Sequence, residues 1–235
     1  MTFDSPRAAY QYAIAQPGFV ADDAQRRAVD ALQACHEALH RGRAPIIGVY
    51  LWGPVGRGKT WLMDQFYQSL RVPARRQHFH HFMGWVHQRS FQLTGVQDPL
   101  QALARELAQE VRVLCFDELF VNDIGDAIIL GRLFQVMFEE GVVMVCTSNQ
   151  PPDQLYAGGF NRERFLPGIA AIQQHMQVVA VDGAEDHRLH PGLGVQRYWV
   201  NQPDALGEVF KQLTEGQAVR SGPVSVGYRS IVAVQ

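Results

Sequence analysis

The stretch that decides the fold is Gly53-Pro54-Val55-Gly56-Arg57-Gly58-Lys59-Thr60, which matches the pattern G-x-x-x-x-G-K-[ST] at every position. Glycine at positions 56 and 58 lets successive backbone N–H groups turn around a dense anion such as a triphosphate. Lys59 is expected to reach the β- and γ-phosphates, and the Thr60 hydroxyl to hold Mg²⁺. The alternative is a glycine-rich turn that binds nothing.

The sequence on either side of this loop favours the phosphate-binding interpretation. An almost continuous apolar run at 46–52 precedes it, as in a strand buried on both faces of a parallel sheet. A helix is predicted from Lys59 to about Leu70, and its N-terminal amides and dipole would point at the phosphates.

Strands and helices alternate through most of the chain. Further strands are predicted at 76–82, 111–116, 142–146 and 176–181, and helices at 22–40, 85–93, 99–110, 123–140 and, with a break near 158–159, 151–174. This alternation predicts an α/β fold, a P-loop NTPase with a three-layer parallel sheet flanked by helices.

The predicted domain organisation has three parts. An N-terminal helical segment covers 1–45, the P-loop core covers 46–184, and a small α+β appendage covers 185–235. The appendage is expected to hold short strands at 196–200, 224–226 and 231–234 and a helix at 204–213.

Two acids follow the apolar strand at 111–116. Asp117 is expected at the carboxyl edge of the sheet, where it would hold Mg²⁺ directly or through water. Glu118 is the more informative residue, because a carboxylate beside the metal aspartate can polarise an attacking water as a general base. The alternative is a pair of solvated acids at a strand end.

A polar tip also follows the strand at 142–146. Asn149, or less favourably Ser148, could bond the attacking water or the γ-phosphate. The alternative is an asparagine that turns the chain before Pro151.

The segment 160–167 contains two arginines beside aromatic residues. Arg164 is the candidate arginine finger, with Phe165 and Leu166 anchoring the backbone next to it. An equal alternative is a surface helix on which Arg162 or Arg164 makes ordinary ion pairs with Glu163 or a neighbour.

Two other clusters are interpreted more plainly. His78 and His80 would share a strand face and could suggest a metal pair, but no Cys or acidic residue follows at ligand spacing. Three arginines near a turn could touch nucleic acid, although a solvated rim is the simpler interpretation: Arg71, Arg75 and Arg76.

Composition limits the class of protein. The chain has 235 residues, 47% of them hydrophobic, and a net charge of −2, so bulk attraction to nucleic acid is not expected. No signal peptide or membrane span is visible, and Cys35, Cys115 and Cys146 do not form a disulfide pattern. We expect a cytoplasmic protein without integral membrane contact.

Several motifs together resemble one family, the ZapE-like cell-division ATPases, which include the mitochondrial lactation-elevated ATPases. The matching runs span about Tyr10 to Arg188: GVYLWG (48–53), RGKTWLMD (57–64), HFHHFM (78–83), LCFDE (114–118), TSNQPP (147–152) and RERFLP (162–167).

The resemblance implies an AAA+ ATPase core that binds ATP and Mg²⁺, forms homo-oligomers and associates with the tubulin-like Z-ring protein during division. By position it makes 53–60 the nucleotide loop, Asp117 and Glu118 the Walker B pair, Asn149 the first sensor and Arg164 the arginine finger. Arg188 matches a family Asp-Tyr-Arg motif in which His187 replaces the tyrosine.

The chain departs from the family pattern at its C-terminal end, where no complete helical lid is evident before Gln235. Other functions therefore stay open beside ATP hydrolysis. One is a nucleotide-gated binding module with little hydrolysis, and another is a helicase-loader-like ATPase acting on DNA. A small-molecule kinase is less favoured, because no acceptor pocket is recognisable.

Overall fold

The computed structural model describes residues 3–17, 19, 21–42, 45–183, 222–226 and 229–233. Contacts divide the chain into two compact units, Met1–Leu193 and Gly194–Gln235. The predicted boundary near Ala184, the strand at 196–200, the helix at 204–213 and the motif residue Arg188 lie outside the described residues.

A five-stranded parallel sheet forms the centre of the first unit. Its strands are β1 (Gly48–Trp52), β2 (Ala74–His78), β3 (Val113–Asp117), β4 (Val143–Ser148) and β5 (Met176–Ala180), in the order β2-β3-β4-β1-β5. Because all the strands run the same way, their carboxyl ends share one edge, so the segments that follow β1, β3 and β4 come together.

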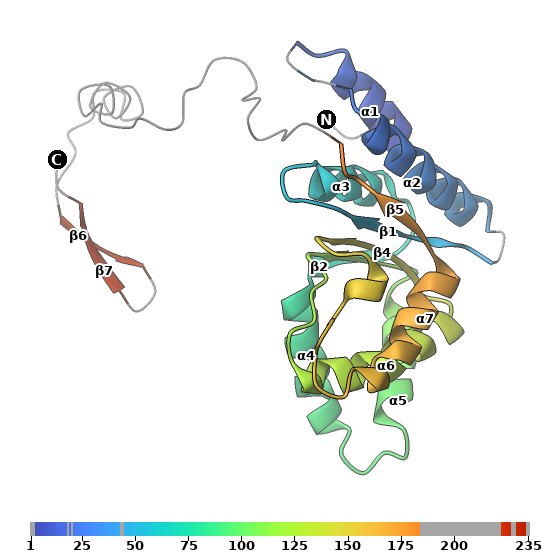
Figure 1. The fold of residues 1–235 in the computed structure, drawn as a ribbon, viewed down its shortest axis with the longest axis vertical. Helices are drawn as coiled ribbons and strands as arrows, with labels where there is room; N and C mark the ends of the chain where they lie inside the picture. The colour runs from blue at the N-terminus through green and yellow to red at the C-terminus, as the bar shows by residue number, and fades with distance from the viewer. Residues whose placement is uncertain are drawn as a thin grey trace. The chain divides into compact units, whose positions relative to one another are not determined.

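Helices cover both faces of this sheet (Figure 1). One face carries α1 (Pro6–Ile14), α2 (Asp23–Arg41) and α3 (Lys59–Ser69), and the other carries α4 (Phe79–Gln92), α5 (Pro99–Glu110), α6 (Ile124–Glu139) and α7 (Leu166–His175). In β3, Val113 and Cys115 face the first layer, whereas Leu114 and Phe116 face the second. The predicted three-layer α/β fold is confirmed.

Local sequence signals explain where several helices begin. The Asp22, Asp98 and Asp123 carboxylates accept bonds from the N–H groups of Ala24, Gln101 and Asp126, and so cap α2, α5 and α6. Helix α1 was not predicted as a separate element, although Ser5 caps it and Pro6 stands at its first position.

The prediction of a strand at 76–82 was wrong in its second half. Strand β2 ends at His78, and Phe79 begins α4. The spacing of Phe79, Phe82 and Val86, all buried against the sheet, follows a helical period and decides the outcome. His78 and His80 consequently do not share a strand face.

The predicted helical region at 151–174 was also largely wrong. It consists of two short 3₁₀ turns, η1 (Pro152–Gln154) and η2 (Arg162–Arg164), and only α7 is an α-helix. Tyr156 and Asn161 take positive φ angles of 54°, as does Gly158 at 72°, and an α-helix cannot continue through them.

The second unit is described only in part. Strands β6 (Gly222–Val226) and β7 (Arg229–Ala233) pair antiparallel, close to the two short β runs predicted there.

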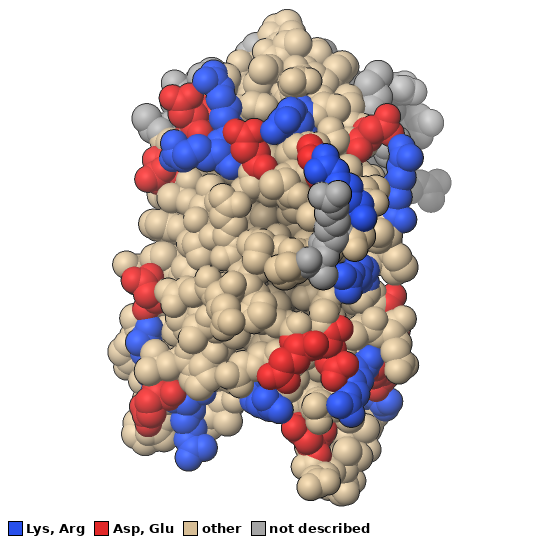
Figure 2. Space-filling view, turned by 90° about the vertical axis from the view of Figure 1, so that its right-hand side faces the viewer, with Lys and Arg blue, Asp and Glu red and all other residues tan. Residues whose placement is uncertain are grey.

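Two further predictions concern the core and the surface. The three cysteines are buried and free, and burial raises the pKa of each thiol, that of Cys35 to about 12. Within the described residues, no helix has the length and apolar character required to cross a bilayer. Figure 2 shows charges of both signs toward the two ends of one face, with a broad uncharged area between them.

Candidate functional site

The phosphate loop connects β1 to α3 and takes positive φ angles at three glycines. Gly53, Gly56 and Gly58 have φ angles of 144°, 80° and 82°. A Cβ on Gly53 would overlap the carbonyl oxygen of Val181, and one on Gly58 would lie 2.8 Å from Nε2 of Gln25. The loop is therefore held between β5 and helix α2.

This loop borders a cavity of about 430 Å³. Its lining includes residues 55–60 of the loop together with Glu118, Thr147, Ser148 and Asn149. The Lys59 ammonium donates to the carbonyl oxygens of Gly53 and Pro54 at 2.6 and 2.7 Å, and to Oδ1 of Asn149 at 3.3 Å. Burial lowers the pKa of Lys59, and the neighbouring Asp117 carboxylate opposes this shift.

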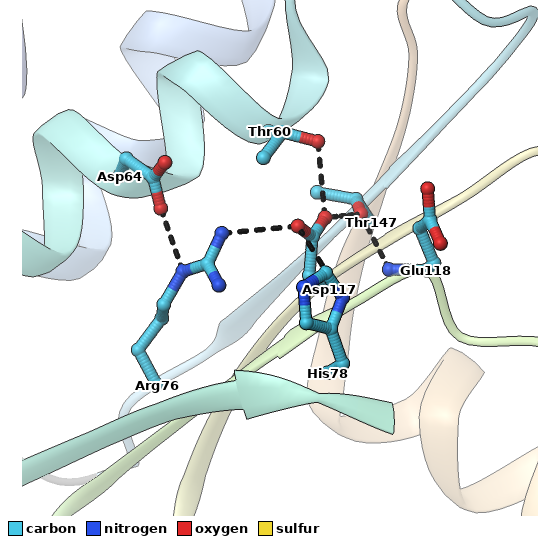
Figure 3. A network of polar contacts seen from close by, with 7 residues as sticks. All are labelled: Thr60, Asp64, Arg76, His78, Asp117, Glu118 and Thr147. Atoms are coloured by element: carbon cyan, nitrogen blue, oxygen red, sulfur yellow. Dashed lines mark hydrogen bonds and ion pairs between the residues drawn. The ribbon is translucent and has the colours of Figure 1, made fainter. Parts of the chain in front are cut away.

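Asp117 lies at the end of β3 with a side chain only 4% exposed. Its Oδ1 accepts hydrogen bonds from the hydroxyls of Thr60 and Thr147 at 3.0 and 2.8 Å (Figure 3). Its Oδ2 accepts from Nη2 of Arg76 at 3.0 Å. Donors from α3, β4 and β2 therefore hold the Asp117 carboxylate from three directions.

Arg76 and Thr147 are site residues that the sequence analysis missed. Arg76 was grouped with the solvated arginines, yet its guanidinium bridges Asp117 and Asp64, the latter at 2.8 Å. Burial alone would lower the pKa of Arg76, but the hydrogen bonds and charges of Asp64 and Asp117 raise it. No local sequence signal distinguishes Arg76, because the register of β2 against β3 places it: His78 lies opposite Asp117, and Arg76 is two residues earlier on the same strand.

The other two arginines of that cluster do face solvent. Arg71 pairs with Asp4, and Arg75 pairs with Glu110 away from the site. The histidines His78, His80 and His81 contact one another through their rings. Within the described ranges, no group of three or more His, Cys, Asp and Glu side chains is placed to hold a metal ion. His78 ends β2 and His80 belongs to α4, so the strand face on which the metal pair was based is absent.

Glu118 directly follows Asp117 but has very different surroundings. Its φ is 57°, its N–H donates to the Thr147 hydroxyl at 3.0 Å, and its side chain is exposed. In Figure 3 the Glu118 carboxylate points away from the bonds around Asp117. It lines both the loop cavity and a neighbouring cavity of about 590 Å³.

Asn149 and Ser148 also differ in exposure, as Glu118 and Asp117 do. The Ser148 hydroxyl is buried and donates to the carbonyl oxygen of Leu119 at 2.8 Å, so it is engaged in holding the chain. Asn149 is exposed, contacts Lys59 and lines both cavities. Of the two sensor candidates, Asn149 is the one whose side chain faces the loop.

Arg164 lies away from both cavities. Phe165 is fully buried beside it, as expected, whereas Leu166 is 45% exposed and was wrongly predicted as an anchor. Arg162 donates to the carbonyl oxygens of Leu155 and Asp153. Arg164 is exposed, and no hydrogen bond or ion pair of its side chain occurs within the described part of the chain. Its carbonyl oxygen leaves no room for a Cβ at Gly131 on α6.

The donors and acceptors of this site fit a nucleotide and a hard cation. Nε and Nη1 of Arg57 and Oε1 of Gln25 are buried without partners among the described residues, and these atoms lie at the loop. The N-terminal end of α3 presents its free amides there. The Thr60 hydroxyl and the Asp117 carboxylate are the hard oxygen ligands that Mg²⁺ prefers.

Strand order, phosphate loop and acidic pair together define a P-loop NTPase core of the AAA+ type. Residues 4–235 match the family model described as AFG1-like ATPase. The chain therefore belongs to the AFG1-like ATPase family.

Two relatives illustrate this membership. The chain is 42% identical over 211 residues to the cell division protein ZapE of Escherichia coli K12, covering 79% of this chain and 56% of that protein. It is 37% identical over 195 residues to lactation elevated protein 1 homolog B of Danio rerio, covering 77% of this chain and 39% of that protein. The chain thus spans about half the length of these relatives or less.

Solved structures support the fold at lower identity. DnaI matches with a TM-score of 0.54 at 19% identity, covering 72% of this chain and 87% of DnaI. AMPPCP-bound DnaA of Aquifex aeolicus matches with a TM-score of 0.53 at 14% identity, covering 84% of this chain and 64% of DnaA.

Proposed function

We propose that this chain binds ATP and Mg²⁺ and hydrolyses the β–γ phosphoanhydride bond. The observation that carries the proposal is the convergence, at one cavity, of Lys59, Glu118 and Asn149 beside the buried Asp117. Residues 53–60 would hold the phosphates through backbone amides and Lys59, and Thr60 and Asp117 would hold Mg²⁺. When bound, Mg²⁺ would neutralise the negative charge that develops on the phosphates during the reaction.

In this proposal, Glu118 is the general base. Its carboxylate makes no hydrogen bond or ion pair within the described residues, and the Thr147 hydroxyl accepts a hydrogen bond from its backbone N–H. An exposed carboxylate that borders the loop cavity can accept a proton from an attacking water. Asn149 would orient that water or contact the γ-phosphate, because its amide already lies within hydrogen-bond distance of Lys59.

Arg164 would complete the site of a neighbouring copy. It is exposed and lines neither of the two cavities described above, which suits an arginine offered to the nucleotide of a neighbouring subunit. An arginine supplied in this way stabilises the charge of phosphoryl transfer. We therefore propose a homo-oligomer as the active form.

The biological role is proposed from the relatives. Because one of them is named a cell division protein, we propose that this chain regulates division through the tubulin-like Z-ring protein in an ATP-dependent way, in the cytoplasm. A pelleting assay with that polymer tests the partner. Binding that occurs with ATP and not without nucleotide supports it, and equal binding in both conditions contradicts it.

The decisive experiment compares ATP hydrolysis by the natural chain and by Glu118→Gln over a range of protein concentrations. Loss of the base should lower kcat by about 100-fold or more while ATP still binds. Glu139→Gln, an exposed substitution on α6 outside both cavities, is the matched control and should hydrolyse ATP normally.

The same assay tests the contribution of Arg164. Arg164→Ala should be inactive alone, but a mixture with Glu118→Gln should regain activity, since one copy supplies the base and the other the arginine. If the natural chain binds ATP and hydrolyses none at any concentration, the enzyme proposal fails and a nucleotide-gated binding module replaces it.

A further inference from the structure

Arg76 connects three elements of the site through one guanidinium. It extends from the edge strand β2, donates from Nε to Oδ1 of Asp64 at 2.8 Å and from Nη2 to Oδ2 of Asp117 at 3.0 Å. Its side chain is 24% exposed, so the pair with the nearly buried Asp117 is shielded from most of the solvent.

The position of Asp64 makes this arrangement specific. Asp64 lies one helical turn after Thr60 on α3, so both side chains point from α3 toward the end of β3 (Figure 3). Thr60 bonds Oδ1 of Asp117 directly, while Asp64 acts on Oδ2 through Arg76. The two oxygens of one carboxylate are thereby held separately by the same helix.

We propose that Arg76, anchored by Asp64, is a positioning residue that orients Asp117 for Mg²⁺. The guanidinium bonds Oδ2, whereas Oδ1 accepts from the Thr60 and Thr147 hydroxyls, so Oδ1 would be the oxygen offered to the metal together with Thr60. This inference rests on the proposed function, because it assigns a role at the same metal site. Partners that orient a metal ligand typically change metal affinity by about 10- to 100-fold when they are removed.

Charge makes the guanidinium difficult to replace. Asp64, Arg76 and Asp117 together carry one net negative charge, and Arg76→Gln would leave two carboxylates without the cation that joins them. Like charges so close repel, and Asp117 would be free to rotate away from Thr60. Arg76→Lys keeps the charge but loses the planar fork that bonds two carboxylates at once.

The test measures how much Mg²⁺ strengthens nucleotide binding, not only turnover. A fluorescent ATP analogue is titrated into each variant with excess Mg²⁺ and again with EDTA. The compared quantity is the Kd in EDTA divided by the Kd in Mg²⁺, which states how much Mg²⁺ strengthens binding. Arg76→Gln should lower that ratio by about tenfold and leave the Kd in EDTA unchanged. Asp64→Asn should lower the ratio less than Arg76→Gln does. The ratio for Arg76→Lys should lie between those of Arg76→Gln and the natural chain.

Arg75→Gln is the matched control, because Arg75 is the neighbouring residue on β2 but pairs with Glu110 instead. Its ratio should equal that of the natural chain. If Arg76→Gln keeps the natural ratio, or if it tightens Mg²⁺ binding, the positioning role is overturned. Should Arg76→Gln fail to fold, Asp64→Asn decides the question, and an unchanged ratio there also overturns the proposal. A natural chain without any Mg²⁺ effect would instead overturn the proposed function.

Discussion

Two sides of the candidate site contrast sharply although they adjoin in sequence. On the side of Asp117, each carboxylate oxygen accepts at least one hydrogen bond and the side chain is nearly buried. On the side of Glu118 and Asn149, the side chains are exposed and border two cavities. The difference suits the proposed roles, since a metal ligand gains from a fixed orientation and a base must meet its water.

The largest expected effect comes from Asp117→Asn on the fixed side. An amide can no longer accept from all three donors, and Arg76 loses its more buried partner. We expect the free energy of unfolding to fall by about 2 kcal/mol, measured by urea denaturation without nucleotide. Glu118→Gln should change it by about 0.5 kcal/mol or less. If both variants lose the same free energy of unfolding, Asp117 is no more important for stability than Glu118, and the contrast between the two sides is contradicted.

An intermediate effect is expected at Thr147, whose hydroxyl joins the two sides. It donates to Asp117 and accepts from the Glu118 N–H. Thr147→Val conserves the shape of the side chain and loses both hydrogen bonds. The free energy of unfolding should therefore fall by about 1–2 kcal/mol. The Mg²⁺ dependence of nucleotide binding should also weaken. Thr147→Ser retains the hydroxyl and serves as the control. A Thr147→Val protein as stable as the Thr147→Ser protein would show that the two sides are independent.

The smallest effect tests the backbone of Glu118. Its positive φ of 57° is unfavourable for any residue with a Cβ. Neither Glu118→Gly nor Glu118→Ala retains the carboxylate, but the glycine variant should be more stable than the alanine variant by about 0.5–1 kcal/mol. Thermal unfolding of the two proteins side by side measures this difference. If the alanine variant is the more stable, no strain is stored at this position.

The sequence was sufficient for the features that depend on local pattern. The apolar strands and the glycine loop each follow from neighbouring residues, and so the parallel sheet and the position of the phosphate loop could be predicted. Asp117 and Glu118 could be paired with Lys59 because strand ends in a parallel sheet meet at one edge.

Features that depend on distant pairing were not predictable in this way. Arg76 resembles its neighbours Arg71 and Arg75 in sequence, and only the register of β2 against β3 separates it from them. The error at 76–82 had a local origin, because the apolar residues Phe79, Phe82 and Val86 already follow a helical period that the strand prediction overlooked. The irregular path of 151–165 depends on positive φ angles at Tyr156 and Asn161. Asparagine often takes such angles, but tyrosine rarely does, so the turn at Tyr156 has no local sequence signal.

The contact between Gly131 and Arg164 has a mechanical consequence. Helix α6 starts just after the loop that follows Glu118, and at Gly131 its backbone meets the backbone beside Arg164 with no side chain between them. Two backbones in direct contact have no compressible layer that could absorb a displacement. A displacement of α6 at Gly131 would therefore also displace the backbone at Arg164, so the position of this exposed arginine depends on the position of α6.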